Sequence, residues 1–209
     1  MEKENILDGL RMVMAIKARA VLPYLVPQLV APPVNLKALA SIGPVAGDAL
    51  HRHLVKIMPA LIGALARAAG SGDEGEALGY AEAVVLSVSD DDDDTGLSCI
   101  MDEFLMSCGQ TDDVANRRAA VTLLHVFCRD TKMDLTNYVP QLIRCLILMF
   151  TSEDQKTLQE AWNALLAVTK NLDPSDLMVY VSDVRQVCYV NYLTLSYYLY
   201  KSGDFNYRV

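Results

Sequence analysis

A proline-containing phrase recurs along the chain inside strongly apolar stretches. Val26–Leu29 and Val139–Leu142 both read VPQL, in VLPYLVPQLV and NYVPQLIRCLILMF, and Ile57–Leu61 is a looser copy in LVKIMPALIGAL. Apolar residues at helical spacing around each copy predict a helix there. A helix that returns with the same local signal is typical of an α-solenoid. The fold class predicted is therefore all-α, built from stacked antiparallel helix pairs.

Composition agrees with a continuous core. Hydrophobic residues make up 52% of the 209 residues and charged residues 21%, a balance that argues against disorder. The chain has five cysteines, an odd number, and none of them are in CxxC spacing. This favours free thiols in a reducing compartment. The N-terminus has no leader-like pattern, and the uncharged stretches 20–36 and 186–200 carry prolines or polar residues. We expect a cytoplasmic protein with no membrane segment.

Amphipathic segments alternate with turn signals roughly every 40 residues. Asn35, then Asp112 or Asp113, then the segment Ser152–Asp154 stand where helix N-caps are expected. Five consecutive aspartates, Asp90–Asp94, predict a solvated acidic loop. The helices expected are 4–19, 21–30, 36–46, 50–69, 74–88, 96–107, 114–127, 134–150 and 158–170.

No pattern of residues indicates catalysis, a cofactor or a metal. The acidic run lacks the spacing of a calcium loop, and His51 and His53 would point apart on a helix. His125 has no acid or nucleophile within sequence reach, and we interpret Trp162 as a wedge between helices. A net charge of −8 without a basic cluster disfavours sequence-specific nucleic-acid binding. The sequence therefore predicts a non-enzymatic scaffold with no catalytic, cofactor-binding or metal site.

The segment TDDVANRRAAVTLL resembles a HEAT-repeat helix. An acidic residue can accept amides at the helix start, and Ala119 and Ala120 allow close packing between helices. In the HEAT family, an arginine at this place commonly pairs with an acidic residue of a neighbouring repeat. Gly47-Asp48 and Ser152–Asp154 are partial echoes of the same motif.

The run from Val21 to Leu61 closely resembles the translational activator family called general control non-derepressible protein one, through its LPYL, PPVN, AGDAL and RHL phrases. AVVLSV, NRRAAVTLLHVFC and EAWNALLAVTKNLD follow in the same order, so the resemblance spans about residues 19–173. It implies a HEAT solenoid that associates with translating ribosomes. It also implies activation of the kinase of initiation factor two alpha, whose RWD domain docks on such solenoids, during amino-acid starvation.

We therefore expect residues 1–186 to form about four to five HEAT repeats of such an activator, which is far longer than this chain. Residues 187–209 are rich in tyrosine and depart from the repeat pattern, so we expect a separate tail. The alternative is a generic HEAT or armadillo-type adaptor, of the transport-receptor or phosphatase-scaffold kind. An isolated stretch of such an array is expected to expose apolar end faces and to self-associate.

Overall fold

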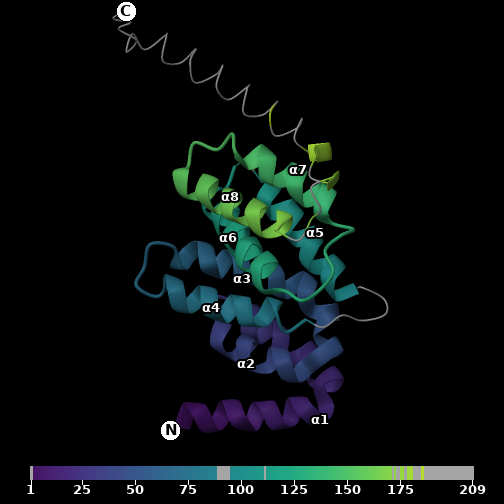
Figure 1. Ribbon diagram of the computed structural model, residues 1–209. Helices are drawn as coiled ribbons and strands as arrows, with labels where there is room; N and C mark the ends of the chain where they lie inside the picture. The colour runs from purple at the N-terminus through teal and green to yellow at the C-terminus, as the bar shows by residue number, and fades with distance from the viewer. Residues whose placement is uncertain are drawn as a thin grey trace, which may run out of the picture.

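The computed structural model describes residues 2–88, 95–110 and 112–170, together with 172, 175, 176, 178–180 and 185. Every regular element in this part of the chain is helical, as the sequence predicts. The helices stack one after another from α1 at one end to α7 and α8 at the other (Figure 1). The acidic run 90–94 and the predicted tail 187–209 lie outside the described residues.

Eight α-helices and one 3-10 helix make up the described part. They are α1 (Glu2–Val30), α2 (Leu36–Ala46), η1 (Gly47–His53), α3 (Leu54–Ala68), α4 (Glu74–Val85), α5 (Thr95–Gly109), α6 (Val114–Asp130), α7 (Val139–Met149) and α8 (Gln155–Thr169).

The helices form antiparallel pairs in two layers. The outer layer contains the second half of α1, then α3, α5 and α7, and each of these contacts the next. The inner layer contains α2, α4, α6 and α8, which contact one another in the same order. Within each pair the two helices pack together, so one apolar core runs along the stack. This is the arrangement of an α-solenoid, in which each pair contacts its neighbours only.

Helix N-caps mark the repeat. Residues 35, 73, 113 and 154 precede the four inner helices and are separated by 38, 40 and 41 residues. The side chains of Asn35, Asp113 and Asp154 each accept a backbone N–H of their own helix, at 3.0, 3.0 and 2.9 Å. Between the two aspartates that the sequence left open, Asp113 is the cap.

The helix α1 is bent. Lys17 has φ −139° and ψ 35°, so residues before and after it form two helices that meet at 17 and not near 20 as expected. Its Ile6–Val30 stretch is long and apolar enough to cross a membrane by length and composition. Only 22% of its most apolar window is buried, and Leu22 and Val26, which are fully buried, belong to the protein core.

Three expected helix starts were wrong. The helix expected from residue 158 begins at Gln155, directly after its cap Asp154. The helix expected from residue 50 begins at Leu54, because Gly47, at φ +53°, leads into the 3-10 helix η1. The helix expected from residue 134 begins at Val139. The Asp134 side chain accepts the Thr136 N–H at 2.9 Å and so closes a turn that competes with the helix.

Candidate interaction surfaces

A charged bridge joins the third helix pair to the fourth. The Arg118 guanidinium on α6 donates two hydrogen bonds to the Asp154 carboxylate, at 2.9 and 2.7 Å. Asp154 caps α8 with the same carboxylate, accepting from the Thr157 N–H at 2.9 Å. The Thr157 hydroxyl and the Arg118 guanidinium together lower the pKa of Asp154 to about 2. The arginine pairing implied by the HEAT resemblance is thus present, and its acidic partner is the cap of the next inner helix.

A second bridge lies on the same two helices. His125 Nδ1 of α6 is 2.9 Å from Glu160 Oε2 of α8, and both side chains are largely buried. Sequence reasoning missed this contact because it looked for an acid near His125 along the chain. Both bridges join residues separated by 36 and 35 positions, slightly less than one repeat. A basic residue on an inner helix followed by an acid at that distance is the signal that could have found them.

The inner layer carries a further charged group where α4 meets α6. Arg129 on α6 contacts Asp130 at 2.6 Å and reaches Glu82 on α4 at 3.5 Å. Burial and a hydrogen bond to Asp130 raise the pKa of Glu82, because both favour its protonated form. Charged contacts therefore cross two successive joints of the inner layer.

Both end helices present an apolar stripe to solvent. In the first half of α1, Met14 is buried, whereas the opposite side of that helix exposes Ile6, Met12, Val13 and Ile16. On α8, buried Ala161 and Leu165 face the core, and Leu158, Trp162 and Leu166 lie exposed at i, i+4 and i+8. Helices that are apolar on two opposite sides are typical of elements covered by neighbours on both sides. The apolar end faces expected from the sequence are therefore exposed.

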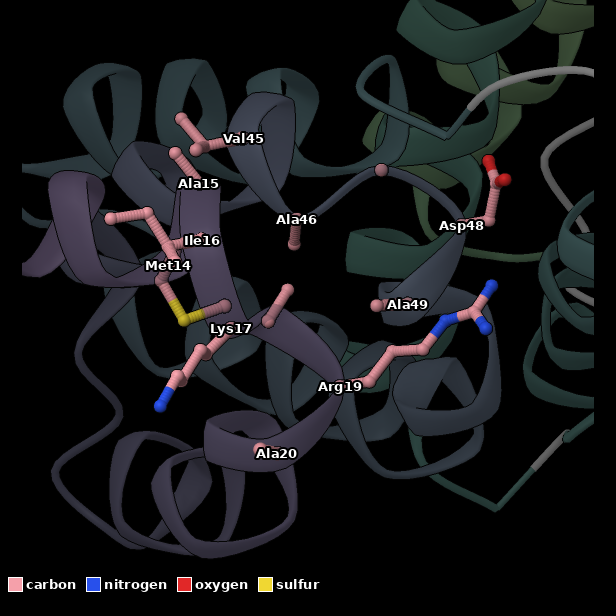
Figure 2. A pocket seen from close by; sticks show the side chains of 12 residues that line it. Met14, Ala15, Ile16, Lys17, Arg19, Ala20, Val45, Ala46, Asp48 and Ala49 are labelled. Atoms are coloured by element: carbon pink, nitrogen blue, oxygen red, sulfur yellow. The ribbon is translucent and has the colours of Figure 1, made fainter.

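A hollow of about 520 Å³ lies beside the bend of α1. Its walls are the bent segment 14–20 and the junction 45–49 of α2 with η1 (Figure 2). Lys17 and Arg19 extend in different directions at its edge, and Asp48 lies on the same side as Arg19. Alanines and other short side chains line most of the hollow, so its chemistry is that of a shallow surface depression.

Several exposed side chains of α1, η1 and α3 are basic. Arg19 and Tyr24 are exposed on α1, and Arg52 and Lys56 are exposed on η1 and α3. Residues 1–70 contain eight Lys and Arg against four Asp and Glu, whereas residues 71–209 contain ten against twenty-two. The net negative charge of the chain therefore conceals a basic first third. The net charge of the whole chain, on which the expectation against nucleic-acid binding was based, hides this asymmetry.

The structure places the three histidines in buried or half-buried positions, whereas Trp162 is exposed and is not the wedge between helices expected from the sequence. His51 is buried in η1, and burial followed by the nearby Lys56 ammonium lowers the pKa of His53. Among the described residues no group of three metal-ligating side chains is found. Trp162 packs against Phe150 with ring centroids 5.6 Å apart, yet 46% of it is exposed at the end of the stack. It therefore forms part of the exposed apolar stripe of α8.

Comparison with known proteins identifies the repeat array. Residues 21–191 match the family described as "Stalled ribosome sensor GCN1-like, HEAT repeats". The chain belongs to this family. It is 42% identical to the human stalled ribosome sensor GCN1 over 183 residues, and 33% identical to the Arabidopsis thaliana protein ILITYHIA over 185 residues. It is also 32% identical to the eIF-2-alpha kinase activator GCN1 of Saccharomyces cerevisiae over 182 residues.

The match covers most of this chain but little of its relatives. It includes 88% of the chain and 7% of the human protein, and 85% and 7% for the yeast protein. No solved structure matches the chain. The names of the human and yeast relatives describe a sensor and an activator, in agreement with the non-enzymatic scaffold predicted from the sequence. The family also displaces the generic adaptor that the sequence left as an alternative.

Proposed function

We propose that this chain is a scaffold segment of a ribosome-associated translational activator, which stimulates the kinase of initiation factor two alpha during amino-acid starvation. The observation that carries the proposal is the family match over residues 21–191, which includes the helix caps and the Arg118–Asp154 bridge. The segment acts in the cytoplasm by holding partners at fixed distances and carries out no chemistry. Its proposed partners are translating ribosomes and, through its RWD domain, the kinase.

The geometry suits a spacer within a longer array. Exposed apolar stripes on α1 and α8 fit further helix pairs on both sides, and the bridges between α6 and α8 hold successive pairs in a fixed orientation. The exposed basic side chains of α1, η1 and α3 remain free for a partner. These arginines and lysine, together with exposed Tyr24, suit an anionic and partly apolar surface.

The test is co-sedimentation from amino-acid-starved cells that express the tagged chain. Lysates are separated on sucrose gradients, and the tagged chain and the kinase are followed by immunoblotting. We expect to find the chain in polysome fractions. After nuclease treatment and a further gradient have removed the ribosomes, we expect the kinase to be recovered together with the chain. Absence of the chain from ribosomal fractions and of the kinase from the pull-down would contradict the proposal.

A charge-reversal pair locates the contact. In one variant Arg19, Arg52 and Lys56 are changed to Glu, and in the control Lys132, Lys156 and Lys170, which are also exposed, are changed to Glu, so that net charge changes equally. Charge reversal at Arg19, Arg52 and Lys56 is expected to lower the recovery of ribosomes with the tagged chain at least several-fold. The control variant is expected to recover ribosomes as the wild type does. Equal losses in both variants would show that net charge, and not these three side chains, governs the association.

A further inference from the structure

Two thiols from different helix pairs meet in the outer layer. Cys108 lies at the end of α5 and is buried, and Cys145 lies in the middle of α7 and is partly exposed. The two helices pack against each other, as Figure 1 shows, and a hydrogen bond links the two thiol groups. The four cysteines among the described residues are all free, so this contact joins two reduced thiols.

A cation stands beside the pair. Arg117, on α6, donates its Nε–H to the Cys108 carbonyl oxygen at 3.0 Å and so sits at the end of α5. The hydrogen bond from Cys108 and then the Arg117 guanidinium lower the pKa of Cys145, against the effect of burial. The same hydrogen bond, together with burial, raises the pKa of Cys108. The two thiols therefore differ in kind: Cys145 is partly exposed and its pKa is lowered, whereas Cys108 is buried and its pKa is raised.

We propose that Cys108 and Cys145 form a reversible disulfide that links α5 to α7 when the chain meets a peroxide. Cys145 is the thiol that reacts first, because it is partly exposed and its neighbours Arg144 and Leu148 on α7 are exposed, whereas Cys108 is buried. Cys108 is the resolving thiol, because it already contacts the Cys145 sulfur. This is a modification of the scaffold itself and does not depend on the partners proposed above.

The chemistry balances with hydrogen peroxide as the oxidant. The Cys145 thiolate attacks one peroxide oxygen, an S–O bond forms and the O–O bond breaks, and the released hydroxide takes up a proton to give water. The Cys108 sulfur, losing its proton, then attacks the Cys145 sulfur of the sulfenic acid. The S–S bond forms, the S–O bond breaks and a second water leaves. Two thiols lose two electrons in total, and one peroxide is reduced to two waters.

Cys128 serves as an internal control. It is buried on α6 near the pair, and burial raises its pKa to about 12. A thiol of this kind is a poor nucleophile and is closed to solvent. Cys99, on α5, is partly exposed, but burial followed by Asp102 raises its pKa. If exposure alone decided oxidation, Cys99 would react as readily as Cys145.

The test is disulfide mapping of the unaltered chain. The folded protein is treated with hydrogen peroxide, free thiols are blocked with N-ethylmaleimide, and the protein is digested without reduction for mass spectrometry. Cleavage after Glu103, Arg117, Arg144 and Arg185 places all five cysteines on separate peptides. We expect the peptide containing Cys108 joined to the one containing Cys145, two hydrogens lighter than their sum, and separated again by dithiothreitol.

Three measurements sharpen the result. The Cys108→Ser variant is expected to trap the sulfenic acid of Cys145 as a dimedone adduct, whereas Cys128→Ser leaves the cross-link unchanged. The oxidised wild-type chain is expected to unfold at a midpoint higher by several degrees, on the order of 5 °C, because a closed loop restricts the unfolded state. Circular dichroism of each variant checks that the helices are retained.

Other outcomes would overturn the proposal. One is a sulfinic acid on Cys145 of the folded wild-type chain without any link to Cys108. Another is a set of disulfides that joins Cys128 or Cys99 as often as Cys108, as oxidation of the urea-unfolded chain is expected to give. Because mapping uses the wild-type protein, it remains decisive even where a variant fails to fold.

Discussion

Two joints of the inner layer hold successive helix pairs by different means. Between α2 and α4 the contact is close and apolar, with Gly43 lying directly against α4. A Cβ atom added at Gly43 would lie 2.5 Å from Ser87 Oγ and 3.2 Å from Ser87 Cβ. Between α6 and α8 the contact includes the Arg118–Asp154 and His125–Glu160 bridges as well as buried alanines. Among the described residues, no ion pair joins α2 to α4.

The difference concerns what each joint can tolerate. A joint that depends on close approach of helix backbones is limited by volume, because a packed interior accommodates added atoms poorly. A joint that contains partly buried charged pairs is sensitive to the charge and orientation of its side chains. Removal of one partner leaves the charge of the other partly buried and unpaired. We therefore expect the first joint to respond to side-chain size and the second to side-chain charge and to pH.

The largest effect is expected from Gly43→Leu. The added side chain would overlap Ser87, and its Cβ would already be in van der Waals contact with Val84 Cα of α4, so we expect a loss of about 3 kcal/mol in the free energy of unfolding. Gly79→Leu is the matched control, since Gly79 is also inside a helix but has open space around it. There the better helix former is expected to add about 0.5–1 kcal/mol. Urea unfolding followed by circular dichroism measures both variants, and similar losses would refute a size-limited joint.

The next effect is expected from Asp154→Ala, which removes the α8 cap and the partner of Arg118 together. We expect a loss of about 2–3 kcal/mol, of which the cap supplies about 1. Asp113→Ala is the control, because Asp113 caps α6 through the Asn116 N–H without bridging to another helix pair. It is expected to lose about 1 kcal/mol. The difference between the two variants measures the bridge, and equal losses would mean that the bridge contributes nothing.

The repeated proline phrase shows how far the sequence leads and where it stops. It correctly predicted helices, and the structure places Pro27, Pro59 and Pro140 in helices of the outer layer. However, the two identical VPQL copies are six residues out of register. Pro59 and Pro140 each precede the next cap by 14 residues, whereas Pro23 precedes Asn35 by 12 and Pro27 by only 8. Pro23 is therefore the structural counterpart of Pro140. Equivalent prolines are defined by their position in the repeat and not by an identical local sequence.

Local chemistry was predictable from the residues themselves, whereas among contacts between helix pairs only the arginine pairing was expected, through the HEAT resemblance. Caps such as Asn35 depend on four successive residues, which the sequence shows directly. The partner of His125 could not be named, because it depends on the angle at which α8 packs on α6. The same holds for the Cys108–Cys145 contact, whose residues lie on helices that the chain separates with α6. Such contacts follow from the geometry of the stack.

A smaller effect is expected from pH, and only at the second joint. The pKa of Asp154 is about 2 in the folded chain, below the ordinary value of about 3.9 in an unfolded one. The stabilisation it provides is therefore complete above about pH 4 and is lost as the pH falls toward 2. We expect this loss to be about 1–2 kcal/mol after screening by solvent. Asp154→Asn keeps a capping side chain but does not titrate, so it provides the baseline.

The measurement is the difference in unfolding free energy between wild type and Asp154→Asn at pH 5, 4, 3 and 2. Other carboxylates titrate in both proteins and cancel in the difference. The two curves are expected to converge toward pH 2. Curves that stay parallel throughout would show that Asp154 has an ordinary pKa and that the bridge is not formed in solution.

The smallest effect is expected at the His125–Glu160 bridge. Its two side chains are 2.9 Å apart and about a quarter exposed, so their coupling is expected to be about 0.5–1 kcal/mol. A double-mutant cycle with His125→Ala and Glu160→Ala measures it at pH 7, and repetition in high salt tests its charged character. The same cycle on Gly43→Ala and Ser87→Ala is expected to show coupling that salt does not change, because that contact is steric. Coupling that salt weakens equally at both joints would remove the distinction between them.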